Sequence, residues 1–198
     1  MGDCALCRQN VGFLVGSWMP QGNNKLLGNH PEIGVQLGGE SKFWRADGIF
    51  SYRCSRARNR YTVDSLGHSV TTDEFNSWML GVEGGFKFLR SSTFSADVFA
   101  GLAYDVIFSI EEAGDPEEPV SHSSLAASIG LRQRFFLNQR SGRYIGAIVR
   151  YSLVDYDNPG GTDLSGNTLS ISFIFGWIVH ETLNQFLDKL NYKGSRRP

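Results

Sequence analysis

The sequence has 198 residues, and its 19 basic and 20 acidic side chains give a net charge of −1, which argues against a nucleic-acid binder with a clustered basic excess. Aromatic residues make up 13% of the chain, and 23 glycines stand beside only 6 prolines, a composition that favours strands and tight turns over long helices. The length predicts one domain. No apolar stretch reaches the about 18 residues that a membrane-spanning helix needs, which excludes a helical membrane protein.

The first nine residues precede any strand pattern and contain a C-x-x-C pair, Cys4 and Cys7. This pair lacks the βαβ surroundings of a redox motif and the second pair that zinc requires. Cys54 stands alone, so we predict no disulfide framework, metal site or cofactor. No charged region is followed by an apolar run, so a secretory signal peptide is not expected within this sequence.

Eight segments alternate between apolar and polar residues with period two, the spacing that places successive side chains on opposite faces of a strand. The predicted strands cover residues 10–18, 32–40, 43–54, 76–88, 93–108, 122–136, 143–154 and 168–178. The linkers between them are alternately long and polar, or short. This alternation is typical of an up-and-down barrel with large loops at one end and tight turns, together with both termini, at the other.

Residues 179–198 change to a helical period, which is carried by Val179, Leu183, Phe186, Leu187 and Leu190. We predict a short amphipathic helix after the last strand. It would cap the barrel mouth, contact a lipid interface or form the start of a linker.

Side-chain size indicates which face of the strands points inward. In segment 76–88 one face carries large rings such as Trp78 and Phe88, and the other carries Gly81 and Glu83. An eight-strand interior holds only a modest filling, so this many rings cannot all lie inside. The polar face therefore points inward, and its charged residues include Glu40 and Arg53 together with Arg45, Asp47, Glu83, Lys87, Asp97, Asp105, Arg132, Arg134 and Arg150.

Large aromatic residues near the strand ends form a predicted lipid-facing girdle, which comprises Trp44, Tyr52, Trp78, Phe88, Phe94, Tyr104 and Trp177. Ten residues at about 3.4 Å, tilted near 45°, rise roughly 24 Å, which matches the apolar band of about 25 Å in membrane-spanning barrels. Placing the charged face toward lipid would cost about 2–4 kcal/mol for each Arg or Lys at the midplane. The charges are therefore expected to face inward.

This arrangement, with strands such as GVEGGFKF (81–88) and GLRQRFF (130–136), resembles the small outer-membrane barrels of Gram-negative bacteria, the class of outer-membrane proteins A, X and W. The resemblance covers about residues 10–178. It implies an all-β, eight-stranded antiparallel up-and-down transmembrane β-barrel in a bacterial outer membrane, followed by the short C-terminal amphipathic helix. Residues 1–9 would then be an N-terminal periplasmic segment, and 179–198 a C-terminal helix or tail.

The inward charges have two interpretations. They would line a narrow ion path or gate, since rings of charge select ions, or they would form a static ion-pair network that plugs a barrel too narrow to conduct. The narrow interior favours the second interpretation. The resemblance implies the same, because the smallest barrels of this class are mostly anchors.

The long loops offer candidate binding residues. Arg56, Arg58 and Arg60 recur at every second residue and would project from one face of an extended loop, where they suit lipopolysaccharide phosphates. The alternative is a solvated charged loop. The acidic residues between 111 and 118 would hold divalent cations or form an acidic loop without ligand, and we favour the latter.

We expect an anchor and surface-display scaffold whose partners are outer-membrane lipid, lipopolysaccharide, and a host or periplasmic protein, without nucleic acid. Two alternatives stay open. One is a narrow channel or transporter for small apolar or ionic solutes. The other is a soluble lipocalin-like ligand-binding barrel, in which Trp78, Phe88 and Tyr104 would be buried. No nucleophile, base and orienting group can be matched, so we predict that the protein is not an enzyme.

Overall fold

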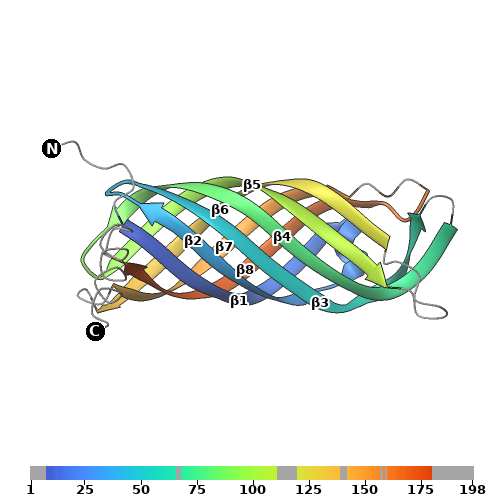
Figure 1. Cartoon of the computed structure of the whole chain (residues 1–198), viewed down its shortest axis with the longest axis horizontal. Coiled ribbons are helices and arrows are strands. Elements are labelled where there is room, and N and C mark those ends of the chain that lie inside the picture. Colours follow the sequence, from blue (N-terminus) through green and yellow to red (C-terminus); the bar gives the residue numbers. More distant parts are fainter. Residues whose placement is uncertain are drawn as a thin grey trace, which may run out of the picture.

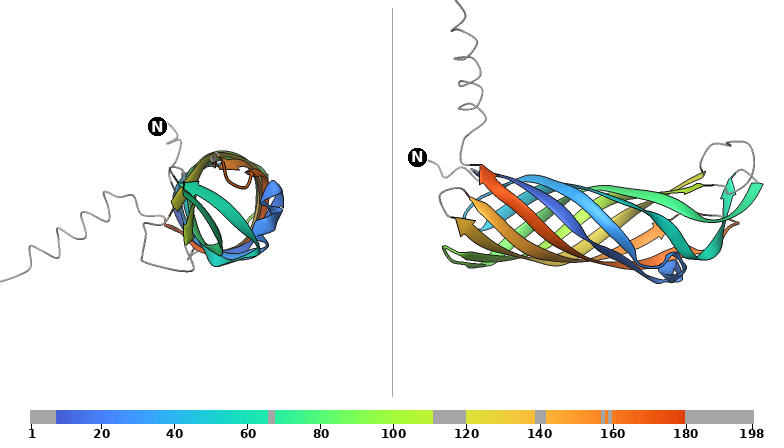
Figure 2. Two further views of the ribbon diagram at one scale, coloured as in Figure 1. Left: turned by 90° about the vertical axis from the view of Figure 1, so that its right-hand side faces the viewer. Right: turned by 90° about the horizontal axis from the view of Figure 1, so that it is seen from below.

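A computed structural model describes residues 8–65, 68–110, 120–138, 142–156, 158 and 160–179. Within them, eight antiparallel strands close into a barrel in which the last strand pairs with the first (Figures 1 and 2). The elements are β1 (Arg8–Gly22), η1 (Asn23–Leu27, a 3-10 helix), β2 (His30–Glu40), β3 (Trp44–Ser65), β4 (His68–Arg90), β5 (Phe94–Ile110), β6 (Val120–Asn138), β7 (Arg143–Tyr156) and β8 (Leu164–Val179).

The predicted fold class is confirmed, and every predicted strand is found, several of them with longer bounds. The described part of the chain has no helical segment with the length and apolar character needed to span a bilayer. The predicted C-terminal helix, the C-x-x-C pair and the acidic stretch 111–118 lie outside the described residues.

Tight turns connect the strands at the end of the barrel where β1 begins and β8 ends, on the left of Figure 1. Two of these turns use the same device. The Ser41 hydroxyl accepts the Trp44 N–H at 3.1 Å, and the Ser91 hydroxyl accepts the Phe94 N–H at 3.0 Å. A serine that satisfies a backbone donor in this way stabilises a tight turn. Two of the three predicted short turns are therefore observed at this end.

Residues 55–65 and 68–74 correct one prediction, because they continue β3 and β4, whereas the sequence predicted a long loop there. The resulting hairpin reaches beyond the other strands (teal to green, right of Figure 1). Inward-facing apolar residues explain the extension, since Tyr61, Val63 and Phe75 are at most 1% exposed and pack in one cluster. The many polar residues between them obscured this period-two pattern in the sequence.

Two apolar clusters fill part of the interior. The cluster at the long-loop end includes Trp18, Leu27, Tyr61, Phe75, Ile107 and Tyr156. The second comprises Leu14, Phe99, Tyr144, Ile148, Ile174 and Ile178. The sequence predicted an interior of small residues and ion pairs, so these rings are an addition. Glycines make room for them: a Cβ at Gly130 would collide with the Phe99 ring, and one at Gly176 would lie 2.6 Å from Cζ of Tyr144.

Candidate functional site

The interior charges form three clusters, and the first is centred on Glu83 of β4. Its carboxylate accepts hydrogen bonds from Arg132 Nη2 at 2.7 Å and from Arg150 Nε at 2.8 Å. Arg132 Nη1 also lies 2.8 Å from Asp47 Oδ2 and 3.5 Å from Asp97 Oδ1. These five residues are at most 4% exposed. Opposite charges from neighbouring strands therefore replace the water that would otherwise solvate each group.

The second cluster surrounds Arg53 of β3. Arg53 Nη1 donates to Asp105 Oδ2 at 2.9 Å, and Arg53 Nε donates to Glu32 Oε1 at 3.2 Å. The same Glu32 oxygen accepts the Ser51 hydroxyl at 2.9 Å. The guanidinium carbon of Arg53 lies 4.7 Å from the centre of the Trp18 ring, within the range of a cation–π contact. This cluster thus joins the charges to the apolar cluster at the long-loop end.

The third cluster lies at the short-turn end, around Glu40 of β2. Glu40 Oε2 accepts a hydrogen bond from Arg134 Nη1 at 2.7 Å, and Oε1 lies 3.1 Å from Lys87 Nζ. Arg45 Nη1 lies 3.7 Å from the same carboxylate and also pairs with Asp47 of the first cluster through its Nε. One carboxylate therefore faces three cations.

The structure places all the charged residues predicted for the inner face inside the barrel. Glu32 also lies inside the barrel. The sequence analysis did not identify it, because Glu32 is the first residue of a predicted strand. A signal was present, since Glu32, Gln36 and Glu40 recur every fourth residue and therefore share one face of β2. All three are at most 3% exposed.

The predicted girdle residues lie on the outer face of the barrel. Trp44 is 61% exposed, Phe88 47% and Tyr104 49%. Four more are half-buried, namely Tyr52, Trp78, Phe94 and Trp177. Three of these four pack on other rings of the same face, as Trp78 does on Tyr104 with ring centres 6.0 Å apart. The exposure of Phe88 and Tyr104 opposes the lipocalin-like alternative, which required both to be buried.

The predicted phosphate-binding arginines lie where β3 loses its regular pairing with β4. The register shifts between Arg56 and Tyr61, so residues 57–60 form a bulge in the hairpin. Arg56, Arg58 and Arg60 are exposed. Arg56 forms an ion pair with Glu74 of β4, with Nη2 2.5 Å from Oε1.

The bulge faces η1 across a cavity of about 460 Å³, which we call the hairpin groove. Its basic lining residues are Lys25, Arg56 and Arg58, whereas Arg60 is not among the lining residues. The close approach of the two walls depends on Gly28, where φ is 85° and an added Cβ would lie 3.1 Å from the Arg58 Cβ. The structure thus brings two of the three predicted arginines together with a lysine that the sequence analysis had not singled out.

The connection between β7 and β8 is hydrogen-bonded both to η1 and to β3. Asn23 Nδ2 donates to Asp163 Oδ2 at 2.6 Å, and Asn158 Oδ1 accepts the Asp64 N–H of β3 at 3.1 Å. Hydrogen bonds from the side chain and the backbone N–H of Ser165 hold the pKa of Asp163 below its usual range. Asp163 is therefore a carboxylate at neutral pH, which is the form that accepts these bonds.

Cys54 is free and exposed on β3. Across the described ranges, no group of three or more His, Cys, Asp or Glu side chains is arranged to hold a metal ion.

No protein-family model matches the chain, and no curated protein matches it. Among solved structures, it is similar to Neisserial surface protein A, with a TM-score of 0.60 and 9% identity over 89% of this chain and 99% of that one. It is also similar to a major outer membrane protein from Thermus thermophilus, with a TM-score of 0.57 and 9% identity over 87% of this chain and 98% of that one. Such low identity shows the fold alone, which is that of small outer-membrane barrels, as the sequence resemblance implied.

Proposed function

We propose that the chain is an integral protein of a bacterial outer membrane, where it acts as an anchor that displays its long-loop end at the cell surface. The observation that carries this proposal is the sorting of side chains between the two faces of the barrel. Large apolar residues cover the outside, including Phe13, Val82, Leu102, Ile129 and Phe173, each at least 49% exposed. Soluble monomers rarely expose apolar patches of more than a few hundred Å², whereas lipid favours such a belt.

The filled interior supports an anchor over a channel. Trp18 is fully buried against Arg53, so the apolar cluster at the long-loop end packs directly on the charged cluster around Arg53. An ion moving through the barrel would have to displace paired guanidinium and carboxylate groups, each of which would then lose its partner in a poorly hydrated space.

We expect the refolded barrel to show no steady ohmic conductance steps in a planar lipid bilayer. Insertion is verified first on the same sample by the shift in mobility between unheated and boiled protein on a detergent gel. Stable unitary steps from a sample that passes this check would favour the channel alternative and contradict the anchor.

The hairpin groove supports a surface role for the long-loop end. Lys25, Arg56 and Arg58 line it, and exposed arginines pair well with phosphate because the guanidinium fork offers two parallel donors. In a bacterial outer membrane this end faces the lipopolysaccharide leaflet, whose phosphates lie just outside the apolar band. We therefore assign the groove to lipopolysaccharide phosphates.

The double variant Arg56→Gln/Arg58→Gln is expected to bind lipopolysaccharide about tenfold more weakly than the unaltered barrel, because two charge-assisted contacts are lost. The measurement is a titration of labelled, detergent-refolded barrel with purified lipopolysaccharide. The matched control is Arg60→Gln/Arg143→Gln, which removes the same charge from residues that do not line the groove and should bind within about twofold of the unaltered barrel. If both variants bind lipopolysaccharide equally weakly, the loss of binding comes from the change in net charge, and the groove is not the binding site.

A further inference from the structure

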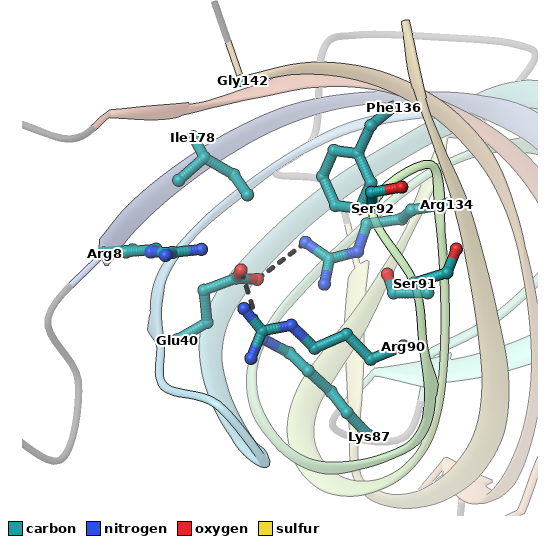
Figure 3. Close-up of a pocket in the computed structure, with 11 residues that line it drawn as sticks. Arg8, Glu40, Lys87, Arg90, Ser91, Ser92, Arg134, Phe136, Gly142 and Ile178 are labelled. Atoms are coloured by element: carbon teal, nitrogen blue, oxygen red, sulfur yellow. Dashed lines mark hydrogen bonds and ion pairs between the residues drawn. The ribbon is translucent and has the colours of Figure 1, made fainter. Parts of the chain in front are cut away.

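A second basic cavity lies at the short-turn mouth of the barrel, at the opposite end from the hairpin groove. Its volume is about 260 Å³, several times the roughly 30 Å³ that a water molecule occupies in the liquid. Five charged residues line it: Arg8, Glu40, Lys87, Arg90 and Arg134. Figure 3 shows these side chains converging on the Glu40 carboxylate, which bonds to Arg134 and Lys87. We call this cavity the rim site.

A β-bulge builds one wall of the rim site. The pairing of β4 with β5 shifts register between Lys87 and Leu89, so Arg90, and not Leu89, follows Lys87 along the cavity wall. In a regular strand, residues three apart would point to opposite faces. Leu89 is 52% exposed on the outside, where an apolar side chain is expected. The bulge thus gives β4 a second cation at the mouth, Arg90 beside Lys87, without turning a charge toward lipid.

The charges lining the rim site do not balance. Arg8, Lys87, Arg90 and Arg134 supply four cations, whereas Glu40 supplies one carboxylate. That carboxylate is also shared with Arg45, which lies below it in the interior. A concentration of positive charge in a partly enclosed space attracts an anion.

Buried donors without partners provide an independent sign of a ligand-binding site. Arg134 is fully buried, and its Nε and Nη2 have no hydrogen-bond partner in the structure, although Nη1 binds Glu40. The Ser95 hydroxyl, 2% exposed, is likewise unpartnered. Both side chains line the rim site. Leaving such groups unsatisfied costs about 1–3 kcal/mol each, so an acceptor that reached them would be bound favourably.

The rim site continues outward toward the apolar belt. A neighbouring cavity shares Lys87, Arg90, Ser91 and Ser92 with it and is also lined by Phe43 and Phe88. Both phenylalanines are exposed on the outer face, at 51% and 47%. Basic and hydroxyl groups next to exposed rings suit a ligand with an anionic head and an apolar tail.

We propose that the rim site binds a phosphate group, and that in the membrane this group belongs to the headgroup of an anionic phospholipid whose acyl chains lie against Phe43 and Phe88. Inorganic phosphate shares the same chemistry and would contact the same donors. Arg134 and Ser95 supply the buried hydrogen bonds, and Arg8 and Arg90 supply charge at the entrance. This site is independent of lipopolysaccharide binding at the other end, so failure of either proposal leaves the other standing.

The test has two probes on full-length barrel refolded in a neutral detergent. Inorganic phosphate is titrated by calorimetry, and phosphatidylglycerol or phosphatidylcholine in mixed micelles is counted as bound adducts by native mass spectrometry. Two variants remove donors without breaking the ion pairs of Glu40. Arg90→Gln should weaken phosphate binding about fivefold, and Ser95→Ala about threefold. The control is Arg143→Gln, a cation at the same end that does not line the site, and it should bind within about twofold of the unaltered barrel.

The readouts separate the possible sources of the phosphate group. Selective retention of phosphatidylglycerol over phosphatidylcholine, reduced in Ser95→Ala, supports the phospholipid headgroup as the occupant. Phosphate binding that depends on Arg90 and Ser95 without selective lipid adducts supports the site and overturns the lipid occupant. If neither probe binds, or if Arg143→Gln weakens binding as much as Arg90→Gln, the rim site is overturned. Ser95→Ala is informative because loss of an unpartnered hydroxyl should not impair folding.

Discussion

Replacement of Glu83 by alanine is expected to lower the free energy of unfolding by about 3–5 kcal/mol. Its carboxylate accepts hydrogen bonds from Arg132 and Arg150, and its removal leaves two guanidinium groups short of a counter-charge inside the barrel. Arg132 keeps Asp47, but the bond of Arg150 Nε to Glu83 has no replacement. Urea titration of the barrel in lipid vesicles, followed by tryptophan fluorescence, gives the change in stability.

Glu74→Ala is the matched control for this prediction. Glu74 also pairs with an arginine, but that partner, Arg56, has a side chain 69% exposed, so we expect a change of under about 1 kcal/mol. Both variants delete a carboxylate from β4, so the difference between their unfolding free energies reports the effect of burial. If both variants lose under about 1 kcal/mol of unfolding free energy, water reaches the interior and solvates the freed guanidinium groups. That result would contradict the interpretation of the interior as a plug.

The two faces of each strand could be predicted because period-two alternation needs only local sequence. In β4, Glu83 and Lys87 fall on the inner face and Trp78 on the outer face, as expected. The alternation fails where the backbone departs from regular pairing. The bulge beside Phe88 turns Arg90 toward the mouth, and nothing in a single sequence marks that position as irregular.

The partners within the charged interior could not be predicted for a different reason. Asp47 lies on β3 and its partner Arg132 on β6, 85 residues away along the chain. Glu40 and Arg134 are separated by 94 residues. Such pairs meet across a closed barrel, and their meeting depends on strand stagger and barrel closure, which alternation does not reveal. The sequence therefore predicted the members of the clusters but not their connections.

The aromatic rings inside the barrel were not predicted, because one rule, that large side chains point outward, was applied to all strands. Phe99 lies on the inner face of β5, the face to which the alternation assigned it. It fits because Gly130 on the paired strand β6 provides the space. A large residue fits inside the barrel when a small residue faces it on the neighbouring strand. Only the strand register shows which residues face each other.

Position along the apolar belt provides the strongest test of membrane insertion. On β4, Val82 lies four residues from Trp78 and four from Phe86, two rings of the outer face, so it occupies the middle of the belt. Leu125 of β6 pairs with Tyr104, at the level of the girdle. Val82 is 66% exposed and Leu125 73%, so the two positions differ in depth far more than in exposure.

Val82→Arg is expected to lower the free energy of unfolding by about 2–4 kcal/mol in lipid vesicles, because the guanidinium would lie at the midplane, whereas Leu125→Arg should cost only about 0–1 kcal/mol near the interface. Reversible urea titrations in vesicles measure both variants. If the outer face met water instead, each substitution would add a charge to an exposed surface and change stability by less than about 0.5 kcal/mol. A depth-dependent penalty thus requires lipid around the belt, since no aqueous surface distinguishes two equally exposed positions in this way.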